Sequence, residues 1–102
     1  MKLGYVYIMS NKYKTTFYIG VTSNLMRRVL EHKKGIGSEF TSKYHLTQLV
    51  YQEMVPGFKY AIRREKQLKN WKKAWKIELI KTINPMIFDL AADWYDKDDL
   101  NP

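Results

Sequence analysis

The sequence predicts a small α+β domain, an α/β sandwich in which a three-stranded antiparallel sheet is flanked by helices. Three stretches rich in aromatic and β-branched residues are bounded by polar turns, as strands are. The other regular stretches repeat their apolar residues at helical spacing. The first two strands are joined by a short loop, so they are expected to pair antiparallel. The order ββαβαα comprises strands at 3–9, 16–21 and 47–54, followed or separated by helices at 25–34, 58–69 and 71–83.

Turn and cap residues set the ends of these elements. Residues 22–24, Thr-Ser-Asn, offer hydrogen-bond acceptors for the N-terminus of the first helix. Two glycines among polar residues predict a mobile loop at 35–46, and Pro56-Gly57 closes the third strand. The last helix is expected to stop at Asn84-Pro85, because proline cannot continue a helix.

The length and composition indicate one globular domain. A chain of 102 residues with 45% hydrophobic and 15% aromatic residues can bury a core but cannot hold two domains. We assign residues 1–90 to this domain and residues 91–102 to an acidic C-terminal tail, which its pattern predicts to be weakly structured. The chain lacks cysteine, which excludes disulfides and thiolate metal sites and fits a cytoplasmic location. No apolar run approaches the roughly 20 residues of a membrane span, and the first residues do not resemble a secretory signal.

The charge is strongly basic and unevenly distributed. The chain has 18 Lys and Arg against 10 Asp and Glu, a net charge of +8. Residues 1–88 carry 17 Lys and Arg and 5 Glu, whereas residues 89–102 carry five Asp and one Lys. Such a basic body attracts a polyanion such as nucleic acid. Charge alone leaves open a basic protein without that function.

The alternation of side chains along a strand sorts the first two strands by face. Val6 and Ile8 share one face of the first strand with the aliphatic residues of the second. If those faces join the core, Tyr7 and Tyr18 lie together on the other face, and Gly20 leaves open space beside them. Ordinary amphipathic tyrosines of a sheet would give the same pattern.

The first predicted helix brings a cation and an imidazole together. Arg28 and His32 are four residues apart and therefore lie on one side of the helix. A guanidinium there can bind phosphate oxygens with two hydrogen bonds, and an imidazole can move a proton. The alternative is an ordinary solvated basic helix.

Glu65 lies on the apolar stripe of the helix predicted at 58–69, three or four residues from Ala61 and Leu68. A carboxylate in such a place needs a partner, because burying it alone is costly. A hard metal ion such as Mg²⁺ is one candidate partner. An ion pair is the other, with basic candidates at Arg63, Arg64, Lys66 and Lys69.

At these residues the sequence resembles the GIY-YIG nuclease superfamily, in particular its small standalone bacterial members. Tyr18-Ile19-Gly20 matches the second half of that name, and Tyr5-Val6-Tyr7 matches the first half with tyrosine in place of glycine. The run from Tyr18 to His32 resembles the family's strand, polar turn and arginine- and histidine-bearing helix. The run 61–71 resembles the segment that holds the family's metal-binding glutamate, and Asn84-Pro85 fits the small bacterial branch. The likeness covers residues 4–90.

The resemblance implies an endonuclease that hydrolyses DNA phosphodiester bonds with one divalent ion, Mg²⁺ or Mn²⁺, in DNA repair or processing. Glu65 is then the metal ligand, Arg28 stabilises the charge on the five-coordinate phosphorus, and His32 assists proton transfer or holds a phosphate. Tyr7 or Tyr18 orients or deprotonates the attacking water. A tyrosine with a pKa of about 10 is a poor base, so a nearby cation is expected to lower that pKa. Candidate contacts to the DNA backbone are Lys33, Lys34, Lys43, Lys72, Lys73 and Lys76.

The sequence departs from the family pattern at two positions. Tyr5 replaces the usual glycine and breaks the literal motif, and Val21 stands where some repair-type members carry a lysine near the tyrosine, which leaves the general base open. No base-reading helix is visible, so we expect a preference for DNA structure or single strands over sequence, with RNA as a possible second substrate. Two alternatives remain: a nucleic-acid-binding module without catalysis, and a protein-interaction module whose charge is incidental.

Overall fold

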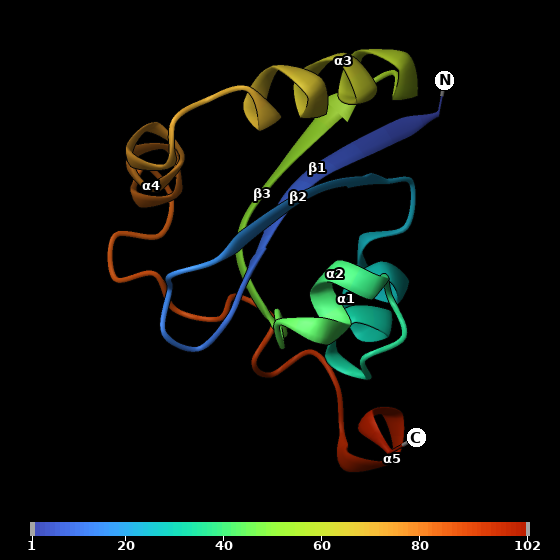
Figure 1. Ribbon diagram of the computed structural model, residues 1–102. Helices are drawn as coiled ribbons and strands as arrows, with labels where there is room; N and C mark the ends of the chain where they lie inside the picture. Colours follow the sequence, from blue (N-terminus) through green and yellow to red (C-terminus); the bar gives the residue numbers. More distant parts are fainter. Residues whose placement is uncertain (1, 102) are drawn as a thin grey trace.

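A computed structural model of the chain describes residues 2–101 and contains a three-stranded sheet with the order β2-β1-β3 (Figure 1). Both strand pairs are antiparallel, so the predicted fold class is confirmed. The strands are β1 (Leu3–Ser10), β2 (Phe17–Thr22) and β3 (Gln48–Pro56). The helices are α1 (Leu25–Lys33), α2 (Glu39–Lys43), α3 (Phe58–Lys69), α4 (Lys73–Lys81) and α5 (Lys97–Leu100).

The alternation of side chains along β1 divides the protein into two cores. Val6 and Ile8 face the first core, where they meet Ala61 and Leu68 of α3 and Ile80 of α4. The opposite face of the sheet carries the second core, which is built on Tyr7, Met9, Leu25, Val29, Leu46, Leu49 and Ala91. Helices α3 and α4 therefore cover one face, and α1, α2 and the C-terminal segment cover the other (Figure 1). Tyr7 and Tyr18 lie on the same face of the sheet, as the sequence predicts. This face is covered by α1, α2 and the C-terminal segment.

Two differences from the predicted elements lie outside the sheet. The loop predicted at 35–46 contains α2, whose N-terminus is capped by the Ser38 side chain accepting a hydrogen bond from the Thr41 amide. A helix of five residues is too short to show a periodic pattern, which is why the sequence did not predict it. Helix α4 is shorter than the predicted 71–83, and the chain turns into Asn84-Pro85 after it.

The C-terminal segment is more ordered than its acidic composition predicts. Asn84 is buried, and its amide donates hydrogen bonds to the carbonyls of Val50, at 3.0 Å, and Phe88, at 2.8 Å. Farther along, the Leu90 amide donates to the Leu49 carbonyl at 2.7 Å. Ala91 is fully buried, and Trp94 and Tyr95 pack against the second core. These aromatic contacts and the Asn84 hydrogen bonds hold the segment against the sheet.

Among residues 2–101, no helix has the length and apolar character needed to cross a membrane.

Candidate active site

Tyr7 and Gly20 are register partners on neighbouring strands, and their contact shapes the site. The Tyr7 ring occupies the space that a side chain at position 20 would fill. A Cβ at Gly20 would lie 2.4 Å from both Cζ and the hydroxyl oxygen of Tyr7, far inside van der Waals contact. The space predicted beside Gly20 is therefore real, and the phenol of Tyr7 fills it.

His32 comes from α1 and meets the end of the Tyr7 side chain. The Tyr7 hydroxyl and His32 Nε2 are 2.8 Å apart, and His32 Nδ1 is 2.9 Å from the Thr41 hydroxyl of α2. His32 has no exposed surface, and Tyr7 and Thr41 are each 1% exposed. Thr41 continues the chain to the Ser38 hydroxyl, 2.8 Å away. Four side chains thus form one hydrogen-bonded row through the second core.

The Thr41 hydroxyl sets the proton positions in this row. It donates to the Ser38 carbonyl at 3.4 Å, so it accepts a hydrogen bond from His32 Nδ1–H. A neutral imidazole has one donor and one acceptor nitrogen, so His32 Nε2 accepts from the Tyr7 hydroxyl.

Burial controls the protonation of this row. It lowers the pKa of His32 from 6.5 to about 4, an effect that the charge of Arg28 reinforces. Burial also raises the pKa of Tyr7 from 10.0 to about 12, because it outweighs the hydrogen bond from Arg28 that acts in the opposite direction. Arg28 thus acts on the pKa of Tyr7 in the expected direction, but burial outweighs its effect. At neutral pH the Tyr7 phenol and the His32 imidazole are therefore both uncharged.

Arg28 is the charged group at this row. Its side chain is 30% exposed and forms an ion pair with Glu31 at 2.9 Å. Burial lowers the pKa of Arg28, but the hydrogen bonds with Glu31 and Tyr7 raise it further and leave it above its ordinary value. Arg28 is thus a permanent cation at the boundary between the buried row and solvent.

Tyr18 lies beside the row on the same face of the sheet. Its ring centroid is 6.4 Å from that of Tyr7 and 5.5 Å from that of His32. It is half-buried and stacks on Phe40 of α2 at 6.3 Å. The two tyrosines, Arg28 and His32 are thus brought together as the sequence predicts; their catalytic roles remain predictions.

Glu65 lies on α3, which covers the face of the sheet opposite to α1 and α2. Its charge contributes to the raised pKa of Tyr7, after burial and the neighbouring Tyr18. Its side chain is 15% exposed and pairs with Lys69 at 3.5 Å, where Lys69 is 51% exposed. The ion-pair alternative is thus present, as a pair between a largely buried carboxylate and an exposed lysine one turn along the same helix.

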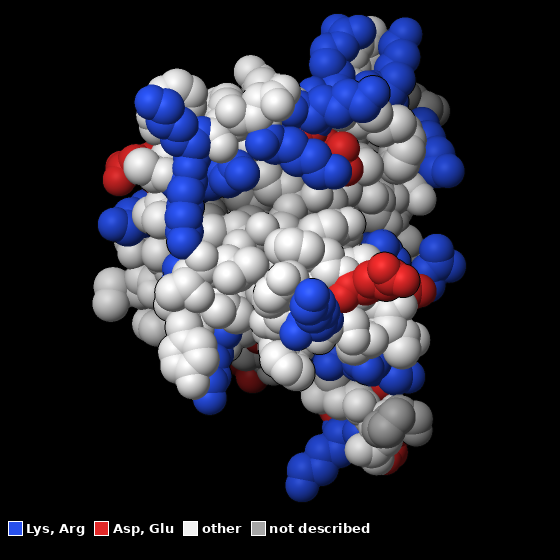
Figure 2. All heavy atoms as spheres, in the orientation of Figure 1, with Lys and Arg blue, Asp and Glu red and all other residues white. Residues whose placement is uncertain are grey.

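The structure separates Lys33 from the other predicted DNA contacts. Lys33 is mostly buried, pairs with Asp89 at 2.6 Å and donates a hydrogen bond to the Thr47 carbonyl. It ties α1 to the C-terminal segment and β3, so the prediction that it contacts phosphate is corrected. Figure 2 shows Lys and Arg side chains gathered over α3 and α4, beside a strip with little charge. The remaining candidates are Lys34, Lys43, Lys72, Lys73 and Lys76.

Three neighbours of the site were not predicted. Thr41 orients His32, Glu31 holds Arg28, and Phe40 stacks on Tyr18. Thr41 and Phe40 belong to α2, which the sequence predicted as a loop. Ser38, a typical N-cap residue, followed at once by the acidic Glu39 is the signal that could have revealed this helix.

Comparison with known proteins agrees with this geometry. The GIY-YIG catalytic domain matches residues 3–78, and the chain therefore belongs to the GIY-YIG family. A UPF0213 protein of Syntrophus aciditrophicus is 38% identical over 82 residues, which cover 79% of this chain and 93% of that protein. The UPF0213 protein SH2523 of Staphylococcus haemolyticus is 36% identical over 76 residues, or 74% of this chain and 92% of that protein. The UPF0213 protein NP_0776A of Natronomonas pharaonis is also 36% identical, over 74% of this chain and 88% of its own length. No solved structure gives a significant match.

The close approach of Tyr7 to Gly20 predicts a large effect of one added methyl group. Gly20→Ala is expected to lower the free energy of unfolding by about 1–3 kcal/mol, since the Tyr7 ring must move away. In a Tyr7→Leu background, Gly20→Ala should lower the free energy of unfolding clearly less, because no phenol occupies the space. Urea unfolding of the four proteins measures both costs. Equal costs in the two backgrounds would show that the ring does not fill this space.

The lowered pKa of His32 predicts a loss of stability in mild acid. Above pH 6.5 the imidazole is neutral in both the folded and the unfolded chain and has no effect. As the pH falls from 6.5 to about 4, the unfolded chain takes up the proton first, which lowers stability by about 3 kcal/mol. Urea unfolding at pH 7, 5 and 4 should show this loss in the wild type. The control His45→Asn should show it too, because the His45 side chain is exposed. The same loss in His32→Asn would contradict the assignment.

Proposed function

We propose that this protein is a Mg²⁺- or Mn²⁺-dependent endonuclease that hydrolyses DNA phosphodiester bonds. The observation that carries the proposal is the buried hydrogen bond between Tyr7 and neutral His32, beside the charge of Arg28. A fold needs no such pair for stability, since burying polar side chains among apolar neighbours is costly unless every donor and acceptor is satisfied. Membership of the family supports a nuclease in general.

The proton of the attacking water leaves through Tyr7. The phenol is protonated at neutral pH, so it does not act as a ready phenolate. Instead, its oxygen takes the water proton while its own proton passes to His32 Nε2, 2.8 Å away. The water oxygen bonds to phosphorus, the bond from phosphorus to the 3′-oxygen breaks, and the leaving oxygen takes a proton from solvent. A transfer of this kind does not require a lowered pKa of the tyrosine.

Arg28 links substrate binding to this transfer. Its charge helps to hold the pKa of His32 down, to about 4, in the free protein. A bound phosphate neutralises that charge and so makes His32 a better proton acceptor when substrate is present. The guanidinium also stabilises the charge that builds up on the phosphoryl oxygens. Glu31 holds Arg28 at 2.9 Å in the free protein, and a phosphate would compete with this pair.

Glu65 is the residue proposed to hold the metal ion. Among residues 2–101, no three His, Asp or Glu side chains form a cage for a metal. One carboxylate is nevertheless sufficient for Mg²⁺, which keeps most of its waters and binds substrate phosphate directly. The donor set therefore fits a site completed by DNA. When bound, the ion supplies a positive charge that polarises the phosphate and stabilises the leaving oxygen.

The basic surface is proposed to hold the DNA backbone. Lys34 and Lys43 lie on the side of α1 and α2, and Lys72, Lys73 and Lys76 lie at α4. Contacts of this kind position DNA without reading its sequence. We therefore propose that the enzyme selects DNA structure or single strands, in DNA repair or processing.

The role of Glu65 can be tested by Glu65→Gln, which keeps the size of the side chain and removes its charge. Cleavage of supercoiled plasmid, branched DNA and single-stranded DNA with Mg²⁺ or Mn²⁺ should fall by about 100-fold or more. Affinity for the same DNAs without metal should change by less than about twofold, because one carboxylate contributes little to backbone contacts.

Glu78→Gln is the matched control, since Glu78 is an exposed carboxylate on the neighbouring helix α4. It should cleave as the wild type does. Equal cleavage by wild type and Glu65→Gln would contradict the metal assignment. A wild type that binds DNA but does not cut it with either ion would instead support the non-catalytic binding module.

A further inference from the structure

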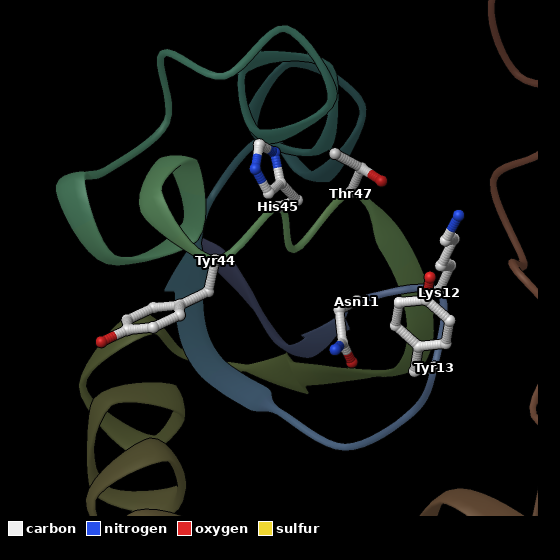
Figure 3. A pocket seen from close by; sticks show the side chains of 6 residues that line it. All are labelled: Asn11, Lys12, Tyr13, Tyr44, His45 and Thr47. Carbon is white, nitrogen blue, oxygen red and sulfur yellow. The ribbon is translucent and has the colours of Figure 1, made fainter.

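A pocket outside the candidate active site opens between the β1–β2 loop and the segment that joins α2 to β3. Its volume is about 440 Å³. It is lined by Asn11, Lys12, Tyr13, Tyr44, His45 and Thr47 (Figure 3). Figure 3 shows Tyr44 on one side, Lys12 and Tyr13 on the other, Asn11 between them, and His45 and Thr47 above. None of the residues proposed for catalysis lines it.

Both walls of the pocket are fixed by hydrogen bonds. The Asn11 side chain accepts from the amides of Thr15, at 3.0 Å, and Thr16, at 3.2 Å, which closes the β1–β2 loop on itself. On the other wall, the Leu46 amide donates to the Thr41 carbonyl at 2.9 Å and ends α2. His45 has φ 57°, a left-handed conformation that costs energy in a residue other than glycine. The pocket is thus formed in the free protein.

Its rim carries two exposed aromatic rings, each beside a cation. Tyr13 is 71% exposed and Tyr44 is 45% exposed. Lys12 lies 5.0 Å from the centre of the Tyr13 ring, and Lys43 lies 5.3 Å from that of Tyr44. Exposed rings with cations beside them suit a flat, π-rich ligand that carries negative charge. A nucleotide has both features.

The interior offers groups that could read the edge of such a ligand. Across residues 2–101, neither the His45 ring nor the Thr47 hydroxyl takes part in a hydrogen bond. In Figure 3 both lie above Asn11 and the two tyrosine rings. Each can donate and accept, as the edge of a base requires.

A row of rings leads from the pocket to the candidate active site. The ring of Tyr44 is 4.9 Å from that of Phe40, and Phe40 stacks on Tyr18 at 6.3 Å with an angle of 29° between the planes. Phe40 is itself 44% exposed. Bases of a strand whose phosphate lies at Tyr18 and Arg28 could therefore stack along this row and reach the pocket.

We propose that this pocket is a subsite for one unpaired nucleobase of single-stranded DNA, an inference that rests on DNA being the substrate. The base stacks on Tyr44 or Tyr13, and its edge faces His45 and Thr47. A base inside a duplex is excluded, because its faces are stacked and its edge is paired. The subsite would give the enzyme its preference for unpaired strands next to the cut.

Binding in the absence of metal tests the subsite without requiring cleavage. The probes are a fluorescein-labelled single strand of mixed sequence, the duplex made from it, and the same strand with abasic nucleotides in its central part. Tyr44→Ala is expected to weaken binding of the intact single strand by about 5- to 10-fold, the low end of the range for a stacking residue. Binding of the duplex and of the abasic strand should change by less than about twofold. Tyr44→Phe, which keeps the ring, should bind as the wild type does.

Tyr60→Ala is the matched control, because Tyr60 is 47% exposed and also has a cation over its ring, but lies on α3. It should not change the ratio of single-strand to duplex affinity. Tyr13→Ala, on the more exposed wall, provides a second pocket variant should Tyr44→Ala fold poorly. Equal weakening of all three probes by the pocket variants, or no weakening of the single strand, would overturn the proposal. So would a wild type that binds none of the probes.

These outcomes are separate from those for the proposed catalysis. A protein that never cleaves DNA could still show the selective loss with Tyr44→Ala. Conversely, an active nuclease whose Glu65 variant is dead could bind all three probes with the same dependence on Tyr44, which would refute only the subsite.

Discussion

The hydroxyl of Tyr7 and Nε2 of His32 are 2.8 Å apart in the layer between the sheet and α1. Two polar groups in such a place would destabilise the fold if either lacked a partner. Gly20 gives the phenol room to cross β2, and α2 supplies Thr41 for the second imidazole nitrogen. The pairing of β1 with β2, helix α1 and helix α2 thus each contribute one part of this contact.

Burial shifts the pKa values of Tyr7 and His32 in opposite directions. It raises the pKa of the phenol and lowers that of the imidazole, so both are neutral at physiological pH. Only the donor-only guanidinium of Arg28 keeps its charge, at the point where the row meets solvent. A negatively charged phosphate would be drawn to that point and would change the proton affinity of the groups behind it. The free site is therefore poised for proton transfer rather than already ionised.

Regular periodicity explains what the sequence could predict. The period of two in the strands places Tyr7 and Tyr18 on one face, and the spacing of four in α1 places Arg28 and His32 on one side. Tyr7 and His32 prove more deeply buried than this pattern implies, because α2 and the C-terminal segment close over them. Such long-range packing leaves no local signal.

Contacts between distant parts of the chain also determine the role of Lys33 and the position of the aromatic rings beside the site. Lys33 looks like any surface lysine of a basic helix, and its partner Asp89 is 56 residues away in the chain. The row of rings from Tyr18 through Phe40 to Tyr44 depends on a five-residue helix whose residues have the sequence pattern of a loop. The features that sequence predicts well here are those set by neighbours within one strand or helix, whereas the features that give the site its chemistry are set by contacts between elements.

The state of the His32 ring tests the central claim most directly. In protein labelled with ¹⁵N-histidine, NMR at neutral pH distinguishes a bare ring nitrogen from a protonated one, and His45→Asn leaves only the signals of His32, since the chain has two histidines. We expect a single neutral tautomer with Nδ1 protonated and Nε2 bare, and we expect Tyr7→Phe to change the Nε2 signal. A ring that averages between tautomers, or that carries both protons at neutral pH, would contradict a buried phenol held by a neutral imidazole.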